Sequence, residues 1–275
     1  MRRRETAILL LLILLSPLAK AQKQGINQCD KNGLKTGEWI AKRENGSIKY
    51  KGYFTQGHPV GKLYRYYPDG KTKAILDFSI TGDTTQAFFI YPNGKKAAQG
   101  EYIKKKKNGT WRTFATSGQV ISVLNFKDNQ LDGTAKTFYE NGNLKTMSIW
   151  RDDNLNGNKF EYYKEGALLS RSQYKNGIEF GIHRMLYRDG KVRFEGSVEQ
   201  GLKQGPWRYY KTNGELQCEL RYKDDKLLNP ETLEGISQDI IPTKEESKNK
   251  ALDPNDFKYN PMEYIQSIRK TQNRF

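Results

Sequence analysis

The sequence predicts an all-β fold: an elongated, twisted antiparallel β-meander of eight 24-residue hairpin repeats, followed by a short, partly helical C-terminal tail. Two periodic features carry this prediction. One glycine recurs every 24 residues without slippage: Gly46, Gly70, Gly94, Gly118, Gly142, Gly166, Gly190 and Gly214. A second glycine stands nine residues earlier in seven of the eight units: Gly37, Gly61, Gly109, Gly133, Gly157, Gly181 and Gly205. Thr85 takes its place in the third unit.

Each unit has the pattern of a β-hairpin. Its first strand runs from the leading glycine to an aromatic pair such as Tyr66-Tyr67, and a turn such as Pro68-Asp69-Gly70 follows. Proline fixes φ early in a type I turn, Asp bonds its own backbone, and glycine adopts the left-handed conformation that restores pairing. The second strand ends on an aromatic or apolar residue in every unit: Phe54, Phe78, Tyr102, Phe126, Trp150, Tyr174, Val198 and Tyr222. Because one hairpin cannot bury its apolar face alone, neighbouring units must share a core.

Residues 1–21 have the pattern of an export signal. Arg2 to Arg4 precede an apolar run from Ala7 to Leu15, and Ala19-Lys20-Ala21 fits the small-x-small cleavage pattern. Nine residues span about 14 Å as a helix, too short for a ~30 Å hydrocarbon core. We therefore expect cleavage before Gln22, export to the periplasm or the cell exterior, and no transmembrane segment after cleavage. A membrane anchor or a buried helix is the alternative.

The rest of the chain divides into three segments. Residues 22–30 form a lead-in, residues 31–225 hold the eight repeats, and residues 226–275 form a tail without repeats. Asn229-Pro230 and Asn260-Pro261 each resemble a helix cap followed by proline at the first helical position. The tail is expected to cap the array, and a partner-binding role is the alternative.

Composition argues against catalysis. The 275 residues carry a net charge of +16, 17 Tyr, 2 His and 2 Cys, and loss of residues 1–21 removes four positive charges and one negative, leaving +13. So few Cys and His exclude a disulfide-stapled scaffold and leave little for zinc. His58 and His183 are five repeats apart, too far to share a catalytic site in a linear stack. We expect no enzyme activity, no catalytic residue, no cofactor and no metal.

The repeat resembles a known family. Arrays of Gly-x-Trp-x-x-Tyr-Tyr-x-Asn-Gly with this period are similar to the MORN-repeat variant family, which includes the YwqK-like antitoxin proteins. The matching stretches include Gly205 to Gly214, Gly37-Glu38-Trp39 and Gly109-Thr110-Trp111. The resemblance covers residues 31–225. It implies elongated, twisted sheets that bind proteins or membrane lipids rather than catalyse.

Together these features predict an exported, non-enzymatic repeat protein of the bacterial envelope. Its positive charge favours a protein partner, an acidic envelope polymer or an anionic lipid surface. The alternative, which the family name suggests, is an antitoxin-like or immunity-like inhibitor of a toxin partner. The sequence holds no nucleic-acid recognition motif, so we expect no nucleic acid.

Two sets of residues are predicted contacts for a partner. The first is a ladder of tyrosines at the ends of the first strands: Tyr67, Tyr91, Tyr139, Tyr163 and Tyr187. The second is a lysine run in the third repeat: Lys104, Lys105, Lys106 and Lys107. Each set has a structural alternative. The ladder would then only pack across strands, and the run would be a solvated turn.

The two cysteines test whether the array is open. Cys29 precedes the first repeat and Cys218 lies in the eighth. About fifteen inter-strand steps of ~4.8 Å would separate them by roughly 70 Å, whereas a disulfide needs Cα atoms within ~7 Å. We therefore expect no bond between them within one chain. A closed ring, in which both sheet edges vanish, is the competing geometry.

Overall fold

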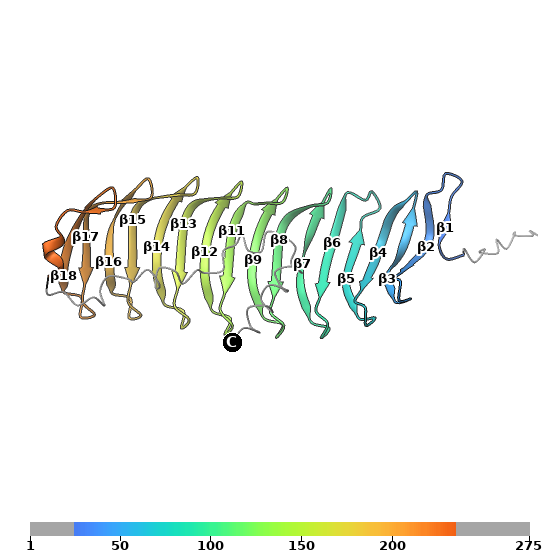
Figure 1. Ribbon diagram of the computed structural model, residues 1–275, viewed down its shortest axis with the longest axis horizontal. Coiled ribbons are helices and arrows are strands. Elements are labelled where there is room, and N and C mark those ends of the chain that lie inside the picture. Colours follow the sequence, from blue (N-terminus) through green and yellow to red (C-terminus); the bar gives the residue numbers. More distant parts are fainter. Residues whose placement is uncertain (1–24, 235–275) are drawn as a thin grey trace, which may run out of the picture.

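The computed structural model describes residues 25–234, which form one elongated antiparallel sheet (Figure 1). The export signal and the helix expected after Asn260-Pro261 lie outside the described residues. The strands are β1 Gln28–Cys29, β2 Lys35–Lys42, β3 Ile48–Thr55, β4 His58–Tyr66, β5 Thr72–Phe78, β6 Thr84–Ile90, β7 Lys96–Ile103, β8 Lys106–Phe114, β9 Val120–Lys127, β10 Gln130–Leu131, β11 Gly133–Phe138, β12 Leu144–Arg151, β13 Asn154–Tyr162, β14 Leu168–Lys175, β15 Ile178–Leu186, β16 Val192–Glu199, β17 Leu202–Tyr210, β18 Leu216–Lys223 and β19 Lys226–Leu227. A short 3-10 helix, Pro230–Leu233, follows them.

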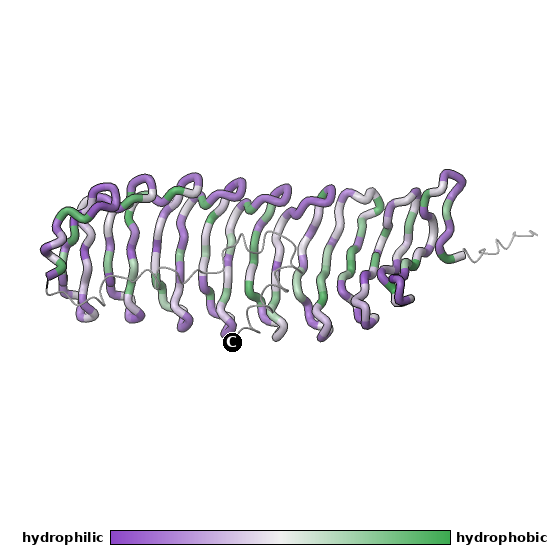
Figure 2. Tube along the Cα trace, in the orientation of Figure 1, coloured by the Kyte–Doolittle hydropathy of each residue, from purple (hydrophilic) through white to green (hydrophobic). Residues whose placement is uncertain are grey.

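The predicted meander of eight hairpins is confirmed. Each strand pairs antiparallel with its neighbour in the sequence, from β1 and β2 at one end to β18 and β19 at the other. Strands β10 and β11 together form the first strand of the fifth repeat, since both pair with β9. Hydrophilic residues colour many of the turns along both long edges of the sheet (Figure 2). The single layer of strands leaves one long face of the sheet available for contact.

The hairpin turns have the geometry that their residues predict. In the second repeat, the Tyr67 amide donates to the Lys71 carbonyl at 2.8 Å, and the Gly70 amide donates to the Tyr67 carbonyl at 3.0 Å. The Asp69 carboxylate accepts the Lys71 amide at 3.1 Å. Gly70 has a φ of +85°, and all eight turn glycines lie between +80° and +100°. This left-handed region is open to glycine at little cost.

The leading glycines are strand bulges rather than strand starts, which corrects the predicted strand boundaries. Strand β8 begins at Lys106, three residues before Gly109, whose φ is +64°. The β7–β8 register shifts at this point, and the same shift occurs beside Gly61, Gly157, Gly181 and Gly205. The β5–β6 pair, in which Thr85 replaces the glycine, keeps an unbroken register. Positive φ at glycine therefore allows the bulge, and Thr85 removes it.

The core lies on one face of the sheet, here called the inner face. Its buried apolar residues form two large clusters, one around Trp111 and one around Trp207. Each indole lies against a glycine of the preceding strand. A Cβ added to Gly100 or Gly196 would approach the Trp111 or Trp207 ring to 2.3 or 2.2 Å. At these two positions the indole therefore requires a glycine on the preceding strand.

Both ends of the sheet are closed by an asparagine side chain. Asn27 accepts the Ile40 amide at 2.7 Å and donates to the Ile40 carbonyl at 3.0 Å. At the other end, Asn229 accepts the Arg221 amide at 2.7 Å and donates to the Glu219 carbonyl at 3.0 Å. Each amide thus replaces a peptide of a further strand and blunts an edge that could recruit another chain.

The cysteine prediction is confirmed. Cys29 is exposed in β1 at one end of the array and Cys218 is buried in β18 at the other. Both are free thiols. The array is open, because its first and last hairpins lie at opposite ends (Figure 1).

Candidate binding surfaces

The tyrosine ladder joins successive repeats. Each hydroxyl donates to the backbone carbonyl 23 residues further along, at 2.7–2.8 Å: Tyr67 to Ile90, Tyr91 to Phe114, Tyr139 to Tyr162, Tyr163 to Leu186 and Tyr187 to Tyr210. Arg43 replaces tyrosine in the first unit and donates to the Tyr66 carbonyl. Ala115 occupies the position in the fourth unit. The five hydroxyls thus act within the sheet, and their role in partner binding stays a prediction.

The lysine run does not form one exposed surface. Lys104 and Lys105 form the turn and Lys106 begins β8, and all three are exposed. Lys107 is only 5% exposed, so it does not share the exposed turn of the other three lysines, and partner binding by the run stays a prediction. Strand alternation turns it to the inner face, where its Nζ lies 4.8 Å from the Trp111 ring centroid. Burial lowers the pKa of Lys107 to about 8.

A lysine ammonium group over a tryptophan ring is a recurring contact that was not among the features predicted from the sequence. Lys35 Nζ lies 4.6 Å from the Trp39 ring centroid, and Lys203 Nζ lies 4.5 Å from that of Trp207. In both cases, as with Lys107, the lysine stands two residues before the leading glycine and the tryptophan two residues after it. The spacing Lys-x-Gly-x-Trp was therefore the signal for this cation–π contact.

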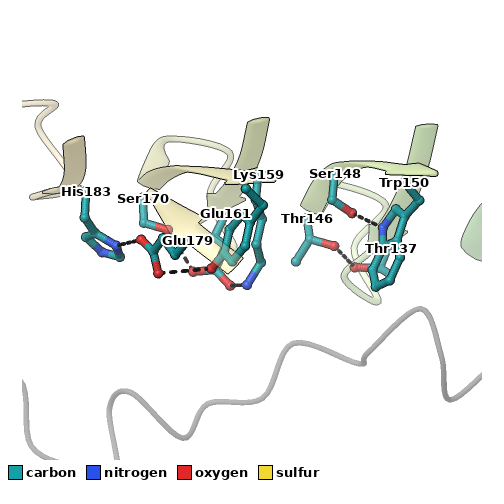
Figure 3. Close-up of polar contacts among 10 residues, drawn as sticks. Thr137, Thr146, Ser148, Trp150, Lys159, Glu161, Ser170, Glu179 and His183 are labelled. Carbon is teal, nitrogen blue, oxygen red and sulfur yellow. Dashed lines mark hydrogen bonds and ion pairs between the residues drawn. The ribbon is translucent and has the colours of Figure 1, made fainter. Parts of the chain in front are cut away.

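Polar side chains occupy the tryptophan position in the sixth and seventh repeats (Figure 3). Lys159 stands at the tryptophan position of repeat six, and its Nζ lies 2.9 Å from Glu161 Oε1. The Ser170 hydroxyl donates to Glu161 Oε2 at 2.7 Å. Burial alone would raise the pKa of Glu161, but the charge of Lys159 and the hydrogen bonds from Lys159 and Ser170 outweigh it and hold that pKa below its usual value.

The network continues in repeat seven. His183 stands at the tryptophan position, and its Nδ1 lies 2.6 Å from Glu179 Oε1. The Tyr174 hydroxyl donates to Glu179 Oε2 at 3.3 Å. The imidazole also stacks on Phe194 and Trp207, with centroids 5.8 and 6.0 Å away. Lys159, Glu161, Ser170, Tyr174, Glu179 and His183 form what we call the inner polar network.

The inner polar network connects three neighbouring strands through hydrogen-bonded carboxylates. Both carboxylates are hydrogen-bonded on both oxygens by neighbouring side chains, on strands β13, β14 and β15. Nearby Thr137 and Thr146 bond each other at 2.7 Å, and the Trp150 indole donates to Ser148 at 2.8 Å (Figure 3). Within residues 25–234, no three His, Cys, Asp or Glu side chains gather closely enough to hold a metal ion.

The outer face is mostly charged and internally paired. Glu38 and Lys51 are 2.8 Å apart, and Arg184 Nη2 lies 2.6 Å from Glu195 Oε2. A shallow hollow of about 210 Å³ lies over β6, β7 and β8. Its floor includes Phe88, and the Gln86 amide donates to Glu101 at 2.9 Å beside it. These features give the outer face a polar surface over much of its length.

Strand β15 places three exposed apolar side chains on the outer face. Ile178, Phe180 and Ile182 are 53%, 43% and 52% exposed. They alternate with Glu179 and His183, which point to the inner face. Sequence reasoning did not single out these three residues. The signal was present, because they interrupt positions that are polar in the three preceding repeats.

Comparison with protein families identifies the repeat. The model described as MORN repeat variant matches four times, at residues 107–128, 131–152, 155–176 and 203–224. The chain carries MORN-variant repeats. These matches confirm the resemblance at the level of the variant and do not distinguish a YwqK-like subfamily. In the 24-residue register of the MORN-variant array, the unmatched unit between the third and fourth matches is repeat seven, which contains most of β15.

Comparison with curated proteins and with solved structures gives no close relative. No curated protein matches the chain. The solved structure "Crystal Structure of TarM" is similar over 32% of this chain and 18% of that one, at 14% identity and a TM-score of 0.25. "Crystal Structure of TcdB2-TccC3-TEV" is similar over 68% of this chain and 12% of that one, at 11% identity and a TM-score of 0.20. The chain therefore spans less than a fifth of either protein, and likeness at these scores supports no argument.

Proposed function

We propose that the chain is an exported, non-enzymatic scaffold of the bacterial envelope that binds a protein partner. MORN repeats generally mediate binding to proteins or membranes, and this chain carries at least four of the variant type. The observation that supports the proposal most is the open sheet with one polar face exposed along the array. The net charge of +13 that remains after loss of residues 1–21 favours an acidic partner.

The arrangement of reactive groups supports a binding role over catalysis. The nearest approach to an acid–base pair is Glu179 with His183. The imidazole stacks on Phe194 and Trp207, and within residues 25–234 it has no hydrogen bond to a serine or cysteine that could act as a nucleophile. In the part of the chain that the structure describes, no helix has the length and apolar character needed to cross a bilayer. The proposed location rests on the export signal in residues 1–21.

To test this proposal, the full chain is expressed in a Gram-negative bacterium, the cells are fractionated, and the N-terminus of the product is determined by mass spectrometry. The proposal predicts a periplasmic or secreted product that begins at Gln22 and retrieves a defined protein from envelope extract of the source organism. A cytoplasmic product that keeps Met1 would contradict export. Hydrolysis or transfer by the purified chain would contradict the non-enzymatic role. Retrieval of a toxin would change the assignment from scaffold to inhibitor.

A further inference from the structure

Strand β15 has an inverted pattern of polarity. The inward positions of a leading strand hold apolar or cation–π residues in most repeats, as Lys107 and Trp111 do in β8. In β15 the inward positions hold Glu179 and His183, and the outward positions hold Ile178, Phe180 and Ile182. An outward-facing isoleucine leaves apolar area in water that burial would remove. The inversion therefore has a cost in stability, because three apolar side chains stay exposed to water.

The other repeats act as internal controls for these outward positions. The corresponding triplets in the three preceding units are polar throughout: Lys106, Asn108 and Thr110; Gln130, Asp132 and Thr134; Asn154, Asn156 and Asn158. The following unit has Leu202, Gln204 and Pro206. In residues 25–234, all three positions are apolar in repeat seven alone. Leu202 is 38% exposed and extends the apolar patch by one residue.

The inner polar network holds β15 in this orientation. Shifting the pairing by one residue would exchange the two faces of a strand. Such a slip would bury Ile178 and Ile182, but it would separate Glu179 from Tyr174 and remove His183 from its stack on Phe194. The register observed pairs Lys175 with Ile178 and Gly181 with Val198. The network thus favours the register that keeps the apolar triplet outside.

Positive charge lies beside the apolar patch. Arg171 and Lys175 of β14 are exposed on the same face, and neither forms an ion pair within residues 25–234. Arg184 is paired with Glu195, so its charge is partly compensated. An apolar centre with a polar, cationic rim is the usual anatomy of a protein interface. Its complement is an apolar segment flanked by carboxylates.

We propose that Ile178, Phe180 and Ile182, with Leu202, form the docking site for a protein partner that presents an apolar segment flanked by Asp or Glu. This inference rests on the proposed binding function and names the place where it occurs. The patch lies within regular strand pairing, level with Gln173 and Ser197. A patch bordered by these polar residues and by the cationic Arg171 and Lys175 suits a polypeptide that presents apolar and acidic side chains together.

To test the proposal, peptides that bind the immobilised full chain are selected from a phage library of random 12-residue sequences. Two variants accompany it. Ile178→Thr/Ile182→Thr removes two apolar side chains and keeps β-branched residues, which suit a strand. Ile80→Thr is the matched control, because Ile80 is 98% exposed in a distant turn. Circular dichroism verifies that both variants are folded.

The proposal predicts enriched peptides with two or more apolar residues flanked by Asp or Glu. Their affinity should fall at least tenfold in the double variant, remain unchanged in Ile80→Thr, and weaken with added salt because the cationic rim is exposed. If the peptides bound the double variant equally well, the patch would not be the docking site, and the proposed scaffold function would still stand. Enrichment of basic peptides, or the absence of any enrichment, would overturn the stated partner chemistry. Patch-dependent sedimentation with phosphatidylglycerol vesicles in place of peptide binding would assign the site to a membrane.

Discussion

The pairing of Gly196 with Trp207 gives a sharp test of how the inner face is packed. A methyl group added at residue 196 would lie 2.2–2.4 Å from three atoms of the indole, which is 3% exposed. The ring would have to retreat by more than 1 Å within a close-packed cluster, since carbon atoms pack at about 3.5–4.0 Å. Gly196→Ala should therefore displace Trp207 from its present position.

The expected cost of Gly196→Ala is about 2–4 kcal/mol in the free energy of unfolding. Overpacking a core by one methyl group typically costs ~1–3 kcal/mol. Moving the ring also strains the hydrogen bond from the Trp207 indole to the Ser197 carbonyl, now 3.1 Å, and losing it adds about 1 kcal/mol. The matched control is Gly52→Ala, where the methyl group would lie 3.2 Å from the Leu63 side chain and should cost about 1 kcal/mol or less.

Urea unfolding followed by circular dichroism measures both variants. A second variant, Gly196→Ala/Trp207→Leu, should be less destabilised than the sum of its single changes, because leucine beside alanine removes the clash. A Gly196→Ala chain within 0.5 kcal/mol of the wild type would refute the glycine–tryptophan rule. Equal losses for Gly196→Ala and Gly52→Ala would also refute it.

Three further predictions concern stability, each measured by chemical or thermal unfolding. Ala115→Tyr should supply the missing rung of the ladder by donating to the Phe138 carbonyl, and should stabilise by about 1 kcal/mol more than Ala115→Phe, which lacks the hydroxyl. Lys105→Gly should stabilise by about 1 kcal/mol, because Lys105 has a φ of +67°, and an unchanged midpoint would count against strain at this turn. Burial lowers the pKa of Lys107 to about 8, so above pH 8 the unfolded chain binds more protons than the folded one. Stability should then rise by about 2 kcal/mol between pH 8 and 9.5, relative to Lys107→Met, and parallel pH profiles would contradict this.

The hairpin turns could be predicted because their chemistry is local. Pro68-Asp69-Gly70 specifies a left-handed glycine without reference to distant residues, and the structure places Gly70 there. The bulge at Gly109 was harder to foresee. A leading glycine fits a strand start as well as a bulge, and only the register between β7 and β8 separates the two.

The candidate site was less predictable, because a run of like residues does not reveal which way each side chain points. Lys104 to Lys107 stand together in the sequence, yet alternation in β8 buries Lys107 and leaves Lys106 exposed. The β15 patch needed a comparison between repeats at fixed register. Ile178 and Ile182 are ordinary strand residues by composition, and their outward direction depends on the position of the Gly181 bulge.

The most direct test of the central claim, a scaffold that binds protein through its outer face, is a photocrosslinking scan in living cells. Benzoylphenylalanine replaces one residue in each of repeats two to eight at the same outward position, one residue after the leading glycine or its counterpart: Lys62, Gln86, Thr110, Thr134, Asn158, Ile182 and Pro206. The account predicts a discrete protein adduct that is strongest at Ile182, weaker at Pro206 and absent at Lys62. Adducts of equal strength at every position, or no protein adduct at any of them, would contradict it.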